Sequence, residues 1–201
     1  AKLIGAVNTV AIKDGRLIGY NTDGIGFKRS FEENTKETVE GKSVFILGAG
    51  GASRAISMTL AMNNAKKIYI CNRTYEKAVN LSNDIKSKAG SLSEAVPMEC
   101  DEMKRAIADS HVLINATSIG MYPNIQDSPL DKSLLNRNLI VCDAVYNPRK
   151  TRLLQYAEEL GCKIVPGIYM LVYQGVESFE LWTDIKAPVD IMFNAVKQSL
   201  D

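Results

Sequence analysis

A short apolar strand, a glycine-rich turn and a helix follow one another between residues 43 and 63, and this order constrains the fold more than any other feature. The run Ser43–Leu47 is apolar and favours β structure, which is typical of a strand buried on both faces. The turn contains Gly48, Gly50 and Gly51. Glycines there allow a tight turn and let backbone amides approach a pyrophosphate at the positive end of a helix. The pattern therefore predicts a dinucleotide-binding unit.

A second apolar strand, residues 67–71, follows that helix and ends at Asn72-Arg73-Thr74. In NAD-binding proteins an Asp or Glu, roughly 20 residues beyond the turn, accepts a hydrogen bond from the ribose 2′-hydroxyl. A cation and an amide suit a 2′-phosphate instead, so the sequence predicts NADP as the cofactor. Ser53 stands where the glycine pattern usually has a third Gly or Ala, and an ordinary strand-to-helix turn remains the alternative.

The bulk properties favour a cytoplasmic enzyme domain. Lys and Arg total 24 against 23 Asp and Glu, so nothing in the net charge indicates binding to nucleic acid or to an anionic membrane. No apolar stretch approaches the roughly 18 residues needed to span a bilayer, and the N-terminus lacks a secretory pattern. The four cysteines (71, 100, 142 and 162) show no C-x-x-C pairing. We expect reduced thiols in the core and no metal site.

Strands alternate with helices along most of the chain, which predicts an α/β fold with a parallel, doubly wound sheet and helices on both faces. The expected strands are 43–47, 67–71, 111–114, 139–142 and 163–165, and the expected helices are 25–33, 51–63, 75–88, 101–108, 150–160, 169–182 and 188–199. Residues 5–20 should form a hairpin, because Asp14-Gly15 lies between two apolar runs. The expected organisation is a hairpin unit at 1–23, a cofactor domain at 24–187 and a C-terminal helix at 188–201.

Small and polar residues follow three of the later predicted strands, at 115–121, 143–148 and 166–170. In a doubly wound sheet, ligands bind beyond the carboxyl ends of the strands. Each segment alone could be plain turn chemistry. Their recurrence at three strand ends favours a binding site.

Seven segments resemble the shikimate dehydrogenase family, in the family's order and over almost the whole chain. They are Gly5-Ala6-Val7-Asn8-Thr9, residues 21–26 (Asn-Thr-Asp-Gly-Ile-Gly), and residues 48–54, 72–74, 115–121, 145–148 and 170–175. The resemblance implies a Rossmann-type cofactor domain facing a substrate domain across a cleft. It also implies reversible reduction of 3-dehydroshikimate to shikimate with NADPH, a step of aromatic amino acid and chorismate biosynthesis.

The resemblance further implies roles for individual residues. Asn8 and Asp23 would hold substrate hydroxyls, and Asp23, the candidate catalytic residue, would partner a catalytic lysine. Tyr146 and Gln174 would approach the substrate from the cofactor side, and Arg54 could lie over the adenine. The implied cofactor-binding residues are Gly48, Gly50, Gly51, Ala52, Asn72, Arg73, Thr74, Lys77, Thr117, Gly167 and Met170. On capping grounds alone, Asp23 could instead be a helix cap.

One departure from the family limits these expectations. Family members carry, before the segment that resembles Gly5–Thr9, a substrate domain with a serine pair and the catalytic lysine, and neither precedes Ala1. We therefore expect a chain cut from a longer protein, whose hairpin is a remnant that packs poorly or forms a homodimer through its exposed edge.

A carboxylate is a poor proton donor at neutral pH unless it is strongly desolvated. Without the lysine we expect NADP binding but little turnover of shikimate. The alternatives are a quinate-using relative and a non-catalytic NADP-binding module.

Overall fold

Six parallel strands form the central sheet of the computed structural model, which describes residues 1–98 and 101–200. Their spatial order is β5-β4-β3-β6-β7-β8, so the chain builds outward from β3 to one edge and then from β6 to the other. The bounds are β3 Ser43–Leu47, β4 Lys67–Cys71, β5 Ser93–Val96, β6 Val112–Asn115, β7 Ile140–Asp143 and β8 Lys163–Val165. This order defines a doubly wound Rossmann-type sheet whose topological switch point lies between β3 and β6.

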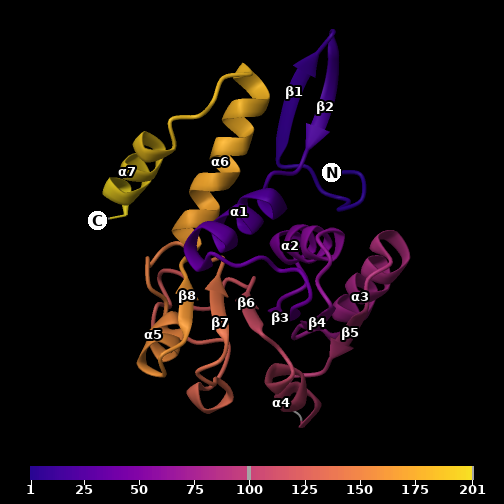
Figure 1. Cartoon of the computed structure of the whole chain (residues 1–201), viewed down its shortest axis with the longest axis vertical. Coiled ribbons are helices and arrows are strands. Elements are labelled where there is room, and N and C mark those ends of the chain that lie inside the picture. Colours follow the sequence, from indigo (N-terminus) through magenta and orange to yellow (C-terminus); the bar gives the residue numbers. More distant parts are fainter. Residues whose placement is uncertain (99–100, 201) are drawn as a thin grey trace.

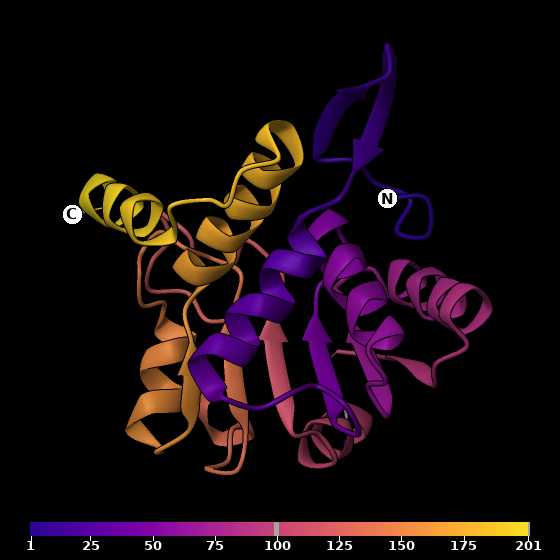
Figure 2. The ribbon, with the colours of Figure 1, turned by 45° about the horizontal axis from the view of Figure 1, so that its top comes forward.

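Helices cover both faces of the sheet, as the alternation of strands and helices predicted. Val44 and Ile46 of β3 join the core beneath α1, α2 and α3, whereas Phe45 and Leu47 join the core beneath α4 and α5. Figure 2 shows α1 and α2 crossing the near face of the strands. The helix bounds are α1 Asp23–Thr35, α2 Gly51–Met62, α3 Tyr75–Ala89, α4 Asp101–Ala108, α5 Arg152–Glu159, α6 Gly167–Thr183 and α7 Val189–Ser199, with a 3₁₀ turn η1 at Lys132–Leu134.

A two-stranded antiparallel hairpin, β1 Thr9–Lys13 and β2 Arg16–Tyr20, stands clear of the central sheet (Figure 1). Its turn has positive φ at Asp14 (50°) and Gly15 (72°), as a tight two-residue hairpin connection requires. The indole N–H of Trp182 on α6 donates to the carbonyl of Val10 at 2.8 Å. This bond ties the hairpin to α6.

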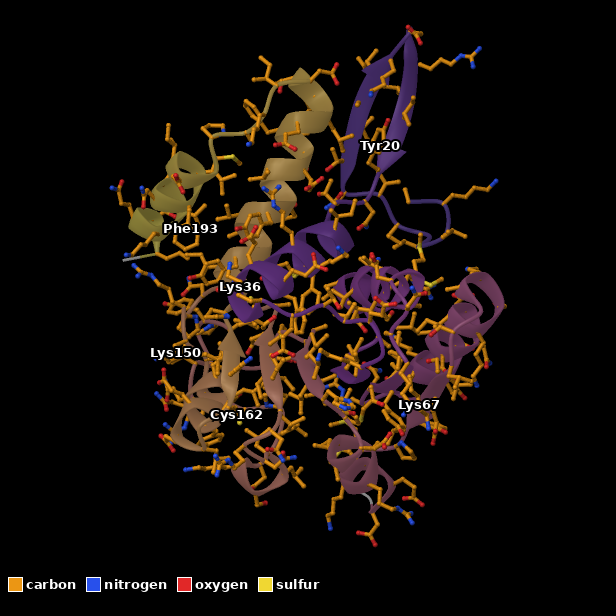
Figure 3. All side chains as sticks on the ribbon, in the orientation of Figure 1. Tyr20, Lys36, Lys67, Lys150, Cys162 and Phe193 are labelled. Atoms are coloured by element: carbon orange, nitrogen blue, oxygen red, sulfur yellow. The ribbon has the colours of Figure 1, made fainter. Side chains whose placement is uncertain are left out.

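The C-terminal helix α7 lies against α6, with the ring centroids of Tyr169 and Phe193 5.0 Å apart. Figure 3 labels Phe193 among the side chains of this part of the molecule. The division of the chain at residues 23/24 and 187/188 stays a prediction.

The structure adds one strand to those predicted. Strand β5, Ser93–Val96, lies at the sheet edge, where β4 is its one partner among the described strands. Its four residues include one buried apolar side chain, Val96, so it lacks the apolar run that marks the other strands.

Cys71, Cys142 and Cys162 are buried, as expected of thiols in the core, while Cys100 lies outside the described residues. Among the described helices, none has the length and apolar character needed to cross a membrane. Within the same residues, no group of three or more His, Cys, Asp or Glu side chains could hold a metal ion.

Candidate cofactor and substrate site

The backbone conformation of the turn at the end of β3 requires glycine at position 48. Gly48 has a φ of 106°, which side-chain-bearing residues rarely adopt. A Cβ on Gly48 would also lie 2.8 Å from the carbonyl oxygen of Ala116. The hydroxyl of Ser53 donates to the carbonyl of Gly48 at 2.6 Å. A serine at the third position therefore closes the turn and explains this departure from the usual glycine pattern.

The other two glycines leave open space at the N-terminus of α2. Among the described residues outside its own chain neighbours and helix backbone, a Cβ built on Gly50 or Gly51 would meet no atom within 4 Å, so packing does not demand glycine at either position. Gly50 is the N-cap of α2, and none of the described side chains caps this helix. An uncapped N-terminus offers its first backbone amides and the positive end of the helix dipole to an anion. Residues 50–52 therefore fit a pyrophosphate group.

A cavity of about 340 Å³ lies at the carboxyl ends of β3, β4 and β6, beside the topological switch point between β3 and β6. It brings together four predicted cofactor residues from three loops: Gly48, Asn72, Arg73 and Thr117. The remaining lining residues are Leu47, Cys71, Met98, Ser118, Ile119 and Pro129. Its volume lies in the usual range of ligand pockets.

The segment predicted to bind the 2′-phosphate forms one rim of this cavity. The Asn72 side chain donates to the carbonyl of Thr74 at 2.9 Å and so holds the loop that presents the exposed guanidinium of Arg73. Lys77 is exposed in the first turn of α3, and its backbone N–H donates to the Thr74 carbonyl at 3.1 Å. Arg54 instead forms an ion pair with Asp84 of α3, which lowers the pKa of that carboxyl. Its place over the adenine stays a prediction.

Asn8 and Asp23, the predicted substrate residues, contact each other directly. The Asn8 amide donates to Asp23 Oδ1 at 2.8 Å, and its Oδ1 accepts from the backbone N–H of Thr22 at 2.9 Å. Thr22, not Asp23, is the N-cap of α1. Asn8 satisfies an amide at the start of this helix, so the alternative reading of Asp23 as the cap does not describe its position.

Helix α6 carries three of the predicted residues. Gln174 packs against α1, because a Cβ on Gly26 would lie 2.6 Å from the Gln174 backbone nitrogen. Gly167 packs against the carbonyl of Val145, 2.4 Å from where its Cβ would be. Met170 is 8% exposed and belongs to the core under α1. The approach of Gly167 and Met170 to a nicotinamide ring stays a prediction.

Tyr146 lies in the loop after β7 and is 41% exposed. Its side chain is therefore accessible on the side of the sheet where ligands of this fold bind.

No individual role was predicted for Asp143, which opens the predicted loop segment 143–148. This carboxylate, at the end of β7, is 2% exposed. It accepts hydrogen bonds from Thr151 Oγ1 (2.6 Å), Asn115 Nδ2 (3.0 Å) and the backbone N–H of Val145 (2.9 Å). Burial raises the pKa of Asp143 to about 6, although these three donors act in the opposite direction. The sequence feature that could have identified Asp143 is an acidic residue at the end of an otherwise apolar strand.

The strand order, the glycine turn and the switch-point cavity define a Rossmann-type dinucleotide-binding domain. Residues 30–150 match the family described as shikimate / quinate 5-dehydrogenase, and residues 167–197 match the shikimate 5′-dehydrogenase C-terminal domain. The chain belongs to the shikimate dehydrogenase family.

Individual relatives agree with this assignment. Shikimate dehydrogenase (NADP(+)) of Methanopyrus kandleri is 47% identical over 201 residues, which are all of this chain and 69% of that protein. A crystal structure of a shikimate dehydrogenase in complex with NADP+ is 40% identical, with a TM-score of 0.91, and the match covers 100% of this chain and 69% of that one. A shikimate 5-dehydrogenase from Listeria monocytogenes in complex with shikimate and NAD is 39% identical, also with a TM-score of 0.91, covering 98% of this chain and 69% of that one. The chain therefore corresponds to the C-terminal NAD(P)-binding region of its relatives.

Proposed function

We propose that the protein is an NADP-dependent shikimate dehydrogenase that interconverts 3-dehydroshikimate and shikimate. The observation that carries this proposal is the rim of the cavity, where Asn72 holds a loop that presents Arg73, and where the four residues after β4, 72–75, include no carboxylate. When bound, NADPH would supply the hydride for reduction of the ketone. The relatives named as NADP(+) enzymes support the same cofactor choice.

On the cofactor side, the residues of this chain would bind NADP and orient it. The first turn of α2, with Gly50, Gly51 and Ala52, would hold the pyrophosphate through backbone amides. Arg73 would bind the 2′-phosphate with the planar donor pair that suits a phosphate, and Lys77 would add a point charge. Thr117, in the loop after β6, would face the adenosine half of NADP across the cavity.

On the substrate side, Asn8 fixes the carboxylate of Asp23 by a hydrogen bond to Oδ1 at 2.8 Å. Oδ2 of Asp23 would then accept a substrate hydroxyl, with Gln174 and Tyr146 approaching from the cofactor side. The alkoxide formed on hydride transfer needs a proton, and the neighbour that the structure gives to Asp23 is an amide, which is not an acid near neutral pH. The 201 residues alone are therefore expected to hold NADP and to turn over shikimate poorly.

Calorimetric titration of the 201-residue protein tests this proposal. NADP should bind about 10- to 100-fold more tightly than NAD, because hydrogen bonds to a charged group contribute about 1.5–3 kcal/mol each. Adding shikimate should produce little heat. Equal affinity for the two cofactors would contradict the reading of Asn72 and Arg73, and steady-state turnover at the rate of a full-length relative would contradict the expected low activity.

Quinate is a second candidate substrate, because the family description that matches residues 30–150 includes quinate dehydrogenases. Parallel assays of shikimate and quinate at equal concentration, with each cofactor, separate the two. A non-catalytic module would bind NADP and show no turnover of either substrate even in a longer protein containing this chain.

We further propose that the hairpin mediates homodimerisation of this chain. Its outward face presents Val10, Ile12 and Leu17, which are 50%, 74% and 78% exposed, and Ile12 and Leu17 are cross-strand partners. Light scattering should give a dimer for the wild-type chain and a monomer for Ile12→Lys. The control is Ile191→Lys on α7, an equally apolar and 69% exposed position outside the hairpin. A monomeric wild type at all concentrations would refute the proposal.

A further inference from the structure

Two loops of the site follow adjacent strands, and one hydrogen-bond network holds both. The Thr117 loop (residues 116–121) follows β6, and the Tyr146 loop (residues 144–148) follows β7. Asn115, at the end of β6, accepts from the hydroxyl and the backbone N–H of Thr117 at 2.7 and 3.1 Å. It also donates to the carbonyl of Ile119 at 3.2 Å. The conformation of the Thr117 loop therefore depends on the orientation of one buried amide.

Asp143 joins that amide to the second loop through a single oxygen. Its Oδ1 accepts both from Asn115 Nδ2 at 3.0 Å and from the backbone N–H of Val145 at 2.9 Å. Its Oδ2 accepts from the hydroxyl of Thr151 at 2.6 Å, which fixes the plane of the carboxylate. Rotation of the Asn115 amide would therefore disturb the start of the Tyr146 loop.

Further contacts bring the same loops together. The backbone N–H of Tyr122, just beyond the Thr117 loop, donates to the carbonyl of Asn147 at 3.0 Å. A Cβ on Gly120 would lie 3.5 Å from the Cβ of Thr151, so this loop also packs on the residue that holds Asp143.

The cost of burying Asp143 distinguishes the network from an ordinary strand end. Taking a carboxylate out of water is unfavourable, and the raised pKa of Asp143 indicates that its three donors do not fully offset this cost. Thr151 already serves α5 as its N-cap, a role that needs no carboxylate beside it.

We infer that Asp143 is a positioning residue that couples occupancy of the adenosine cavity, which Thr117 lines, to the conformation of the Tyr146 loop. The inference rests on the proposed NADP binding and deepens it. A ligand that orders the Thr117 loop would fix Asn115, and through Asp143 it would order the loop that carries Tyr146. Cofactor binding would thereby prepare the substrate-facing loop before substrate arrives.

The test uses adenosine 2′,5′-bisphosphate, which carries the adenosine half of NADP and its 2′-phosphate but no nicotinamide. Because this probe cannot place a ring against Tyr146, any response of the Tyr146 loop must travel through the protein. Amide hydrogen exchange of residues 144–148 is measured with and without saturating probe in the wild type, Asp143→Asn, Thr151→Val and Thr151→Ser. Ser110→Ala is the control, because it removes a buried hydroxyl bonded to Ala106 at 2.8 Å, before β6.

Probe binding should slow exchange in residues 144–148 by about fivefold or more in the wild type, Thr151→Ser and Ser110→Ala, a factor at the lower end of measured couplings. Asp143→Asn and Thr151→Val should bind the probe and lose this response. Binding in the wild type without slower exchange at 144–148, or an undiminished response in both Asp143→Asn and Thr151→Val, would overturn the inference alone. Absence of probe binding in the wild type would refute the proposed function as well, so the two failures are distinguishable. Thermal unfolding of each variant identifies any that does not fold, and Thr151→Val against Thr151→Ser keeps the comparison valid if Asp143→Asn is lost.

Discussion

Replacing Arg73 by alanine is expected to weaken NADP binding about 10- to 100-fold and to leave NAD binding unchanged. The guanidinium is exposed at the rim of the cavity, where its hydrogen bonds to a phosphate would contribute about 1.5–3 kcal/mol. NAD carries a neutral hydroxyl at this position, so the positive charge of Arg73 should contribute little to the affinity for NAD. Titration calorimetry with both cofactors measures the two affinities on the same protein.

Two further variants sharpen this comparison. Arg73→Lys should fall between wild type and Arg73→Ala, because lysine keeps the charge and loses the bidentate geometry. Arg137→Ala is the matched control, since Arg137 is an exposed arginine in the connection before β7, at the amino-end side of the sheet. Equal loss of NADP and NAD affinity in Arg73→Ala would indicate that the residue supports the fold of the pocket and not the choice of cofactor.

The fold could be predicted from sequence wherever a local pattern carries it. Strands β3 and β4 are continuous apolar runs buried on both faces, so their type and their bounds follow from composition. Helix α1 begins two residues before its predicted start, because Asn8, just before β1, accepts a hydrogen bond from the backbone N–H of the N-cap residue Thr22. Strand β5 has no such apolar run, and it forms by pairing with β4 at the sheet edge. Its existence is a tertiary effect.

The candidate site divides in the same way. Gly48 and Arg73 could be proposed as site residues from the sequence because turn geometry and phosphate chemistry act over a few residues, and both line the same cavity. Family resemblance implied substrate-binding roles for Asn8 and Asp23, but their direct hydrogen bond, between residues 15 positions apart, was not predicted. The bond between Asp143 and Asn115 spans 28 residues and two strands. Sequence spacing carries no sign of it, because strand order decides which loop ends meet.

Gly167→Ala is expected to destabilise the protein by about 3 kcal/mol, the upper end of the usual cost of overpacking. The added Cβ would lie 2.4 Å from the carbonyl oxygen of Val145 and 2.9 Å from the carbonyl carbon of Ala144. These are backbone atoms, so no side-chain rotation relieves the clash, and either α6 or the loop after β7 must move. For a protein of this size, the midpoint of thermal unfolding should fall by roughly 6–12 °C.

Gly175→Ala, two turns further along the same helix, is the control for this prediction. Among the described residues outside its own chain neighbours and helix backbone, its Cβ would meet Met192 Cε alone, at 3.4 Å, an ordinary contact with the end of a flexible side chain. Alanine is also the better helix former by about 1 kcal/mol, so this variant should be as stable as the wild type or more stable. If thermal unfolding places Gly167→Ala and Gly175→Ala at the same midpoint, the close approach of α6 to the Val145 carbonyl does not constrain the fold. If the unfolding midpoint of Gly167→Ala alone falls, the close approach of α6 to the Val145 carbonyl constrains the fold. That contact then fixes the distance between α6, which carries Gln174, and the loop that carries Tyr146.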